Sequence, residues 1–326
     1  MRKREFLLAL ASTFAVNAAL PATAEDYPAR PITIVVPFPA GGPTDAVGRI
    51  VAERMRTSLG QSMVIENVAG ASGSIGIGRV AHAAPDGYTI ALGIWSTQVV
   101  NAAIYSLSYD VVKDFEPITL LASSPLMIAG KKTLPANDLD ELIAWLKANP
   151  DNATQGTAGV GSPDHVAGVL FQQLTGTRYQ FVHYRGSGPA IQDLVAGQID
   201  LCMTSPVVIV PQLRAGSIKA YAVTTESRVP SAPAIPTATE AGLKGFQLSV
   251  WLGFFAPKGT PKAIVDKLNA SAVEALASPE VRTRFADFGL TLFPREQETP
   301  AVLGALQKSD IEKWWPIIKA AGIKAE

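Results

Sequence analysis

The chain has 326 residues, 48% of them apolar, and its 28 Lys and Arg balance its 28 Asp and Glu. Without a basic excess, nucleic acid and anionic membrane surfaces are excluded as expected partners, because both attract concentrated positive charge. About 300 residues exceed the usual size of one hydrophobic core and predict two lobes. The single cysteine, Cys202, rules out an intramolecular disulfide.

The first 24 residues have the layout of a secretory signal peptide. Arg2, Lys3 and Arg4 form a basic start, residues 6–20 are almost all apolar, and small residues lead to Ala24. A signal peptidase cuts after such small residues, and the apolar run is too short to span a bilayer comfortably. We therefore predict export with cleavage near Ala24. Because the segment holds three bases and one acid, the remaining chain has a net charge of about −2.

The following residues alternate short apolar runs with amphipathic stretches, as expected of βα units around largely parallel sheets. Residues 32–36 predict a strand buried on both faces, and a helix capped by Thr44 is expected to run to Gly60. Further strands are predicted at 63–67, 88–92, 118–121, 126–129, 181–184, 199–203, 220–223 and 251–256. Further helices are predicted around 75–83, 139–147, 162–174, 191–195, 261–277 and 299–321, the last with a possible kink at Pro316. Cys202 falls in one of these strands, which favours a small buried residue over a nucleophile.

Two loops share one design, a glycine-rich turn followed by a hydroxyl or Asp at a helix start. They are residues 37–45 and 156–165. Glycines let successive backbone N–H groups point outward, and the helix N-terminus adds partial positive charge. Together they predict an anion site that needs no Lys or Arg.

Other chemistries find less support in the sequence. Neither loop has the lysine–hydroxyl ending of a Walker motif or the G-x-G-x-x-G spacing. His82, His165 and His183 lack metal-ligand spacing, and no G-x-S-x-G elbow is present. An exported serine hydrolase of small esters or amides, using Ser162 and His165, remains the alternative function, because these side chains share one side of a helix start.

The mature chain resembles the substrate-binding proteins of tripartite tricarboxylate transporters, also called Bug or TctC-like receptors. The resemblance covers essentially the whole mature chain, in matching order and spacing. The segments that carry it are residues 36–45, 68–76, 84–89, 161–165, 184–190 and 197–200.

The resemblance implies an α/β, two-lobe periplasmic-binding-protein fold (type II-like), with a ligand cleft between domains joined by two crossovers. Crossovers near Ser124 and Leu248 would place residues 25–124 and 249–326 in domain 1 and residues 125–248 in domain 2. By the same resemblance, the two loops grip a ligand carboxylate. The expected binding residues are Phe38, Ala40, Gly41, Thr44, Asp45, Ser72, Gly73, Ser96, Thr97, Gly159, Gly161, Ser162, His165, Tyr184, Arg185 and Ser205.

The expected function is a monomeric periplasmic receptor that performs no catalysis and uses no cofactor or metal. Its partners would be a small carboxylate, either a dicarboxylate or an aromatic or amino acid, and membrane transporter subunits or a sensor. The roles of Asp45, which would repel a carboxylate unless it caps the helix or orients a water, and of Arg185 stay open. Replacing Ser162 with Ala is expected to weaken binding and leave the fold intact.

Overall fold

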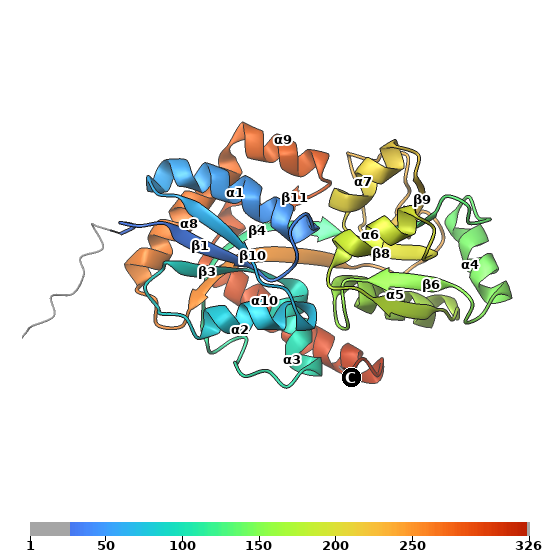
Figure 1. Cartoon of the computed structure of the whole chain (residues 1–326), viewed down its shortest axis with the longest axis horizontal. Coiled ribbons are helices and arrows are strands. Elements are labelled where there is room, and N and C mark those ends of the chain that lie inside the picture. Colours follow the sequence, from blue (N-terminus) through green and yellow to red (C-terminus); the bar gives the residue numbers. More distant parts are fainter. Residues whose placement is uncertain (1–26, 325–326) are drawn as a thin grey trace, which may run out of the picture.

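The computed structural model describes residues 27–324, which form two α/β lobes side by side (Figure 1). The signal-peptide prediction lies outside the described residues. Lobe 1 contains a six-stranded sheet in the order β11-β4-β10-β3-β1-β2. Its strands are β1 (Ile32–Val36), β2 (Met63–Asn67), β3 (Thr89–Ile94), β4 (Phe115–Pro125), β10 (Ser249–Pro257) and β11 (Thr291–Leu292). Its helices are α1 (Pro43–Leu59), α2 (Ser74–Ala81), α3 (Asn101–Ile104), α8 (Lys262–Ala277), α9 (Pro279–Asp287) and α10 (Pro300–Ala320), with short turns η1 (Ala71–Gly73), η2 (Ser96–Val100) and η3 (Arg295–Gln297).

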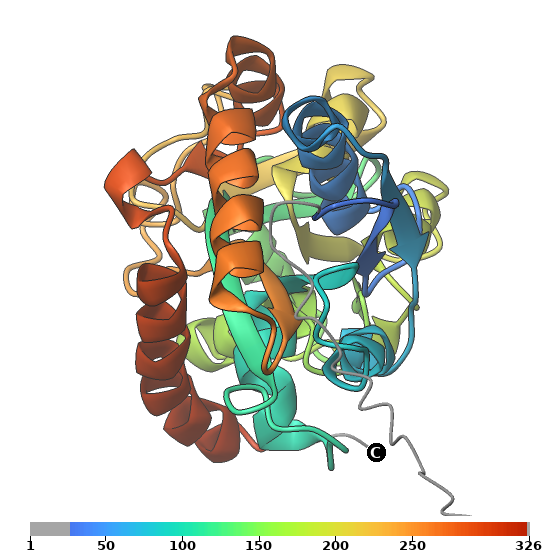
Figure 2. The ribbon, with the colours of Figure 1, turned by 90° about the vertical axis from the view of Figure 1, so that its left-hand side faces the viewer.

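The apolar β1 lies between β3 and the edge strand β2 and is buried, as its sequence predicts. It pairs in parallel with β2 and β3, and helices cover both of its faces, so that Ile32, Ile34 and Val36 are fully buried. Helix α8 packs against α1 and β4, and α10 packs against β4. Figure 2 shows α8 (orange) in front of the sheet and α10 (dark red) along its side.

Lobe 2 contains a five-stranded sheet in the order β7-β6-β8-β5-β9. Its strands are β5 (Met127–Lys131), β6 (Thr154–Thr157), β7 (Gln180–His183), β8 (Leu201–Thr204) and β9 (Ile218–Val223). Its helices are α4 (Leu139–Ala148), α5 (Pro163–Thr175), α6 (Ser187–Val195) and α7 (Pro206–Arg214). Cys202 is buried on β8, in agreement with its expected place in a strand.

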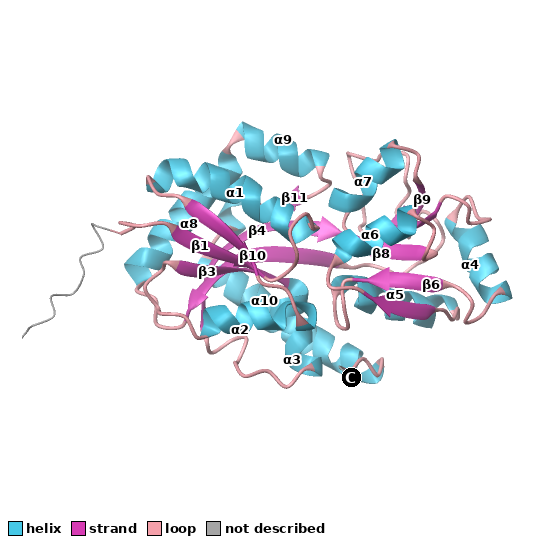
Figure 3. Ribbon diagram, in the orientation of Figure 1, coloured by secondary structure: helices cyan, strands magenta, loops and turns pink. Residues whose placement is uncertain are grey.

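Two antiparallel strands lead into and out of lobe 2. Strand β4 ends at Pro125 and β5 begins at Met127 in the other sheet, so Leu126 alone separates them. The chain returns along β10, where Ser249 pairs with Pro125 at the junction (Figure 3). This pairing supports our proposal that the domain boundaries lie near residues 124–125 and 248–249.

The structure differs from the expected elements in several places. Helix α1 begins at Pro43 after Gly42, so Thr44 is inside the first turn and is not the cap. Strand β6 and helix α7 were not expected, because Gly156 and Pro211 interrupt their apolar patterns. Helix α9 was not expected because it buries only Val281 and Phe285. Pro316 lies inside α10 without ending that helix.

Candidate functional site

A cavity of about 60 Å³ lies where the two lobes meet. One water needs about 10–15 Å³ on this scale, so the cavity has room for roughly five waters or one small molecule. Lobe 1 lines it with Phe38, Pro39, Ala40, Gly42, Pro43, Thr44, Val47, Ile94, Ser124, Val250, Leu252 and Leu290. The crossover and lobe 2 add Leu126, Ala158, Pro163, Asp164, Gly186, Ser187, Gly188, Thr204, Ser205 and Val207.

Four helices present their N-terminal ends to this cavity. The lining includes Thr44 of α1, Asp164 of α5, Gly188 of α6 and Val207 of α7, each in the first turn of its helix. First-turn N–H groups have no partner within the helix, and each helix end carries partial positive charge. The lining residues found in the described part of the chain include no lysine, arginine or histidine. Main-chain dipoles from both lobes therefore supply the positive potential.

Asp45 fixes the shape of the first loop. Its Oδ2 accepts hydrogen bonds from the Gly41 N–H and from Arg49 Nε, both at 2.9 Å. Its Oδ1 accepts one from Asn67 Nδ2 at 2.9 Å, and Asn67 Nδ2 also donates to the Phe38 carbonyl. Asp45 is thus bonded to the loop itself, so its charge is compensated before any ligand arrives.

The ionisation of Asp45 follows from these bonds. Burial alone would raise the pKa of the Asp45 carboxyl, but hydrogen bonds from Arg49, Gly41 and Asn67 outweigh burial and hold it below its ordinary value. The carboxylate therefore stays charged and the loop stays braced at neutral pH.

Ser162 and His165 brace the second loop in a similar way. Ser162 is fully buried and is the N-cap of α5, its Oγ accepting from the His165 N–H at 3.3 Å. The His165 Nδ1 accepts from the Gly161 N–H at 3.1 Å, and its ring packs edge-on against Phe181 and His183. Burial, with a smaller effect of His183, lowers the pKa of His165 to about 4, so the imidazole is neutral.

This arrangement argues against the hydrolase alternative. A nucleophilic serine needs its hydroxyl exposed and hydrogen-bonded to the base that removes its proton. Ser162 instead has no exposed surface, and the ring nitrogen Nδ1 of His165 is occupied by a backbone N–H. Both side chains serve the loop's conformation.

Asp164 is a buried acid in the cavity wall. Its Oδ2 accepts from Ser187 Oγ at 2.9 Å, and Ser187 Oγ in turn accepts from Thr204 Oγ1 at 3.0 Å. Burial raises the pKa of Asp164 to about 7, although hydrogen bonds from Ser187, Thr204 and the backbone of residues 158 and 164 oppose the rise. No lysine, arginine or histidine within residues 27–324 forms an ion pair with it.

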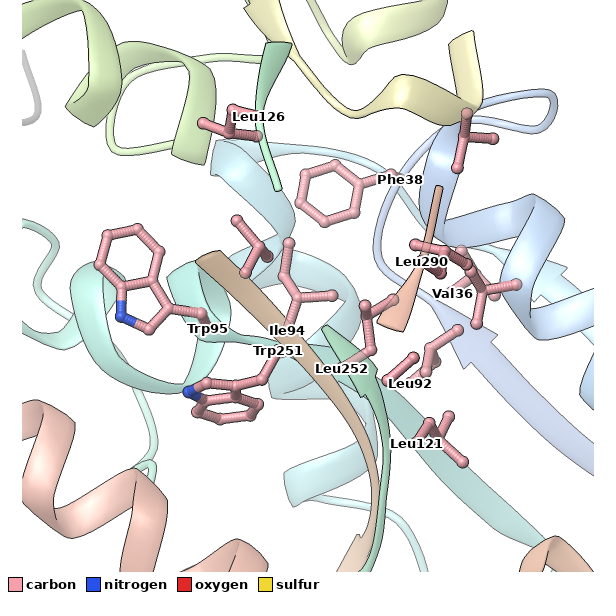
Figure 4. Close-up of a cluster of buried hydrophobic side chains, with 14 of the residues drawn as sticks. Val36, Phe38, Leu92, Ile94, Trp95, Leu121, Leu126, Trp251, Leu252 and Leu290 are labelled. Carbon is pink, nitrogen blue, oxygen red and sulfur yellow. The ribbon is translucent and has the colours of Figure 1, made fainter. Parts of the chain in front are cut away.

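The floor of the cavity is apolar. Figure 4 shows the Phe38 ring among Leu126, Leu290 and Ile94, with Leu252 nearby, and all of these line the cavity. Trp95 does not line this cavity and packs edge-on against Trp314 with ring centroids 4.9 Å apart. Apolar surface thus adjoins the polar helix ends.

A second cavity of about 140 Å³ shares Phe38 and Ala158 with the first. It lies between η1 and the second loop, and Tyr184 and Arg185 line its lobe 2 side. Hydrogen bonds join the lobes at its rim, because Ser72 Oγ and Tyr105 OH both donate to the Val160 carbonyl, at 2.6 and 2.8 Å. The lobes are therefore in contact across the cleft.

The expected binding residues divide into four groups in the structure. The first cavity is lined by Phe38, Ala40, Thr44 and Ser205, and the second by Phe38, Ser72, Gly73, Gly159, Tyr184 and Arg185. Behind the loops lie Gly41, Asp45, Gly161, Ser162 and His165, whose bonds shape them. Ser96 and Thr97 are fully buried in η2 and line neither cavity.

Several residues that line the first cavity were not among the binding residues expected from the sequence. Asp164 lies between Ser162 and His165, and Ser187 and Gly188 lie in residues 184–190, where only Tyr184 and Arg185 were expected to bind. Ser205-Pro206 repeats the hydroxyl–proline helix start of Ser162-Pro163, a signal that predicts α7.

Comparison with known proteins agrees with this geometry. Residues 47–323 match the family described as "Tripartite tricarboxylate transporter family receptor". The chain belongs to this family. Protein BugT of Bordetella pertussis is 35% identical over 322 residues, covering 98% of each chain.

Two solved structures of this receptor family are similar over most of the chain. MatC from Rhodopseudomonas palustris with bound malate is 42% identical, with a TM-score of 0.86, covering 90% of this chain and 100% of its own. R. palustris Rpa4515 with adipate is 34% identical, with a TM-score of 0.88, covering 92% and 99%. The periplasmic binding protein BugD is also similar, with 38% identity and a TM-score of 0.88 over 92% of this chain and 100% of its own. Members of the family are receptors of transporters and are not enzymes. No helix within residues 27–324 is long and apolar enough to cross a membrane.

Proposed function

We propose that the protein is a periplasmic receptor that captures a small carboxylate and delivers it to a tripartite tricarboxylate-type transporter. One observation carries the proposal: four helix N-termini from both lobes meet at one interlobe cavity lined without a cationic side chain. A carboxylate placed there receives charge-assisted hydrogen bonds from backbone N–H groups. The malate and adipate bound by the two neighbours support this ligand class.

Capture by both lobes also explains how binding changes the molecule. A ligand that touches α1 of lobe 1 and the first turns of α5, α6 and α7 of lobe 2 contacts both walls only when the lobes are together. Such a ligand favours the closed arrangement by its differential affinity for it. The closed receptor is then the form that a transporter subunit recognises.

Calorimetric titration of the mature protein with a panel of small carboxylates tests the ligand class. We expect saturable one-to-one binding of at least one member and no turnover of a chromogenic ester. Ester hydrolysis that is lost in a Ser162→Ala variant would restore the hydrolase interpretation.

Thr44 offers a sharper test of the binding wall. It lines the cavity in the first turn of α1, so Thr44→Ala removes a hydroxyl beside the bound carboxylate. We expect about 10- to 100-fold weaker binding, the effect of losing one hydrogen bond to a charged group. Thr57→Ala, at an exposed position of the same helix, is the control and should bind like wild type. Equal affinity of both variants would remove Thr44 from the site.

Export and delivery need separate tests. N-terminal sequencing of protein recovered from the periplasm should begin at Glu25 if cleavage follows Ala24.

Uptake of the identified ligand should depend on the receptor if it serves transport. A receptor that is required for a transcriptional response and not for uptake would instead be a sensor component.

A further inference from the structure

We propose that Asp164 selects a ligand carrying an ammonium group beside its carboxylate, so that the cavity takes a small zwitterionic amino acid with an apolar side chain. This inference deepens the proposed function and rests on it, because the helix ends are still required to hold the ligand's carboxylate. It differs from malate and adipate, the ligands of the two neighbours.

The position of Asp164 is the first argument. The residue is only 4% exposed and lines the interlobe cavity. The groups that hydrogen-bond its carboxyl are Ser187, Thr204 and the backbone of Ala158, and all three also line the cavity. The carboxyl group is therefore part of the wall that a ligand meets.

The second argument is the missing counter-charge. Asp45, the acid at the corresponding start of α1, has Arg49 at 2.9 Å, whereas Asp164 has hydroxyl and backbone donors and no ion-pair partner within residues 27–324. A buried carboxylate without a cation carries a large desolvation penalty. An ammonium group supplied by the ligand would compensate this charge.

The third argument concerns a second carboxylate. A dicarboxylate held within the first cavity would bring one anion to the helix ends and another close to Asp164, because the described lining of this cavity has no lysine, arginine or histidine and Arg185 lies in the adjoining second cavity. Two carboxylates in one desolvated space repel each other unless one is protonated. The wall thus accepts a dianion only with a proton on Asp164, whose pKa burial raises to about 7, and accepts a ligand of no net charge without that proton.

The apolar floor defines the rest of the ligand. Ile94, Leu126, Leu252 and Leu290, drawn with Phe38 in Figure 4, line the cavity. An apolar side chain, such as that of alanine or valine, matches this floor.

The decisive experiment is a calorimetric comparison of four probes on the mature wild-type protein: L-valine, L-alanine, malate and isovalerate. Isovalerate has the valine skeleton without its amino group. We expect L-valine or L-alanine to bind at least about tenfold more tightly than isovalerate or malate, as expected when a charge-assisted contact is gained.

Asp164→Asn then tests whether this residue causes the preference. The substitution keeps the shape and removes the charge, and the amino-acid preference over isovalerate should fall to near unity. Asp151→Asn, an exposed acid of the same lobe paired with Arg178, is the control and should keep the wild-type preference. An Asp164→Asn protein that keeps the preference overturns the proposal.

The outcomes separate the two levels of inference. If malate or isovalerate binds wild type more tightly than both amino acids, the selection by Asp164 falls and the carboxylate receptor stands. If no carboxylate in this panel or the broader one binds, the receptor function fails as well. The wild-type comparison decides these cases even if Asp164→Asn does not fold.

Discussion

At the scale of single residues, the acids and hydroxyls of the two loops have different structural roles although they occupy similar positions at helix starts. Asp45 braces its loop through hydrogen bonds from Gly41, Arg49 and Asn67, and Ser162 caps α5. In contrast, Asp164 and Thr44 line the space between the lobes. A hydroxyl at the start of a helix can either cap that helix or face a ligand, and sequence patterns do not distinguish the two.

Ser162→Ala should therefore destabilise the protein. Removal of the α5 N-cap should lower the free energy of unfolding by about 1 kcal/mol, measured by urea denaturation. Ser227→Ala, an exposed position outside helices and strands, serves as the control and should change stability little. A Ser162→Ala protein with unaltered stability and strongly weakened binding would place its hydroxyl on the ligand, as expected from the sequence.

Asp164 should also make stability depend on pH. Its pKa is raised from 3.8 to about 7 in the folded protein, so the fold holds this proton more tightly than the unfolded chain does. The stabilisation is complete below pH 3.8 and is lost as the pH rises through about 7. Relative to that of Asp164→Asn, the free energy of unfolding of wild type should fall by up to about 1.4 kcal/mol per pH unit between pH 5 and 7. Urea denaturation at several pH values measures this difference, and a difference that is constant with pH contradicts it.

At the scale of elements, strained loops bring the lobes together. Ala71 and Ser72 of η1 have left-handed φ angles of 45° and 48°, a costly conformation for residues with a Cβ. This conformation directs Ser72 toward Val160, whose carbonyl also accepts the bond from Tyr105. Gly161 is needed beside them, because a Cβ there would lie 2.1 Å from Ile104 Cδ1.

We expect the double variant Ser72→Ala, Tyr105→Phe to favour lobe opening. Two lost hydrogen bonds of about 0.5–1.5 kcal/mol each should weaken ligand binding by roughly 5- to 100-fold. The ligand-free variant should also show a larger radius of gyration in small-angle X-ray scattering than wild type. Ser106→Ala, exposed beside Tyr105, is the matched control. Unchanged affinity and radius would show that these contacts do not hold the lobes together.

At the scale of the whole molecule, the two-lobe architecture and most elements follow from the sequence. Alternating apolar runs predicted βα units, and the paired glycine-rich loops predicted an anion site, because both patterns are local. Short strand β6 escaped prediction, since Gly156 within it reads as loop and its burial depends on neighbours from other parts of the chain.

The sequence by itself determined the family, the alternation of strands and helices, and the two loops that we predict to bind an anion. Only the tertiary structure decided that α6 and α7 join them, that Ser162 and His165 act within their own loop, and that Asp164 faces the cavity without a cation. The physical reason is the separation along the chain of the residues that determine each feature. Helix and strand patterns depend on neighbours a few residues apart, whereas the charge and shape of this cavity depend on side chains that approach one another only when both lobes have folded.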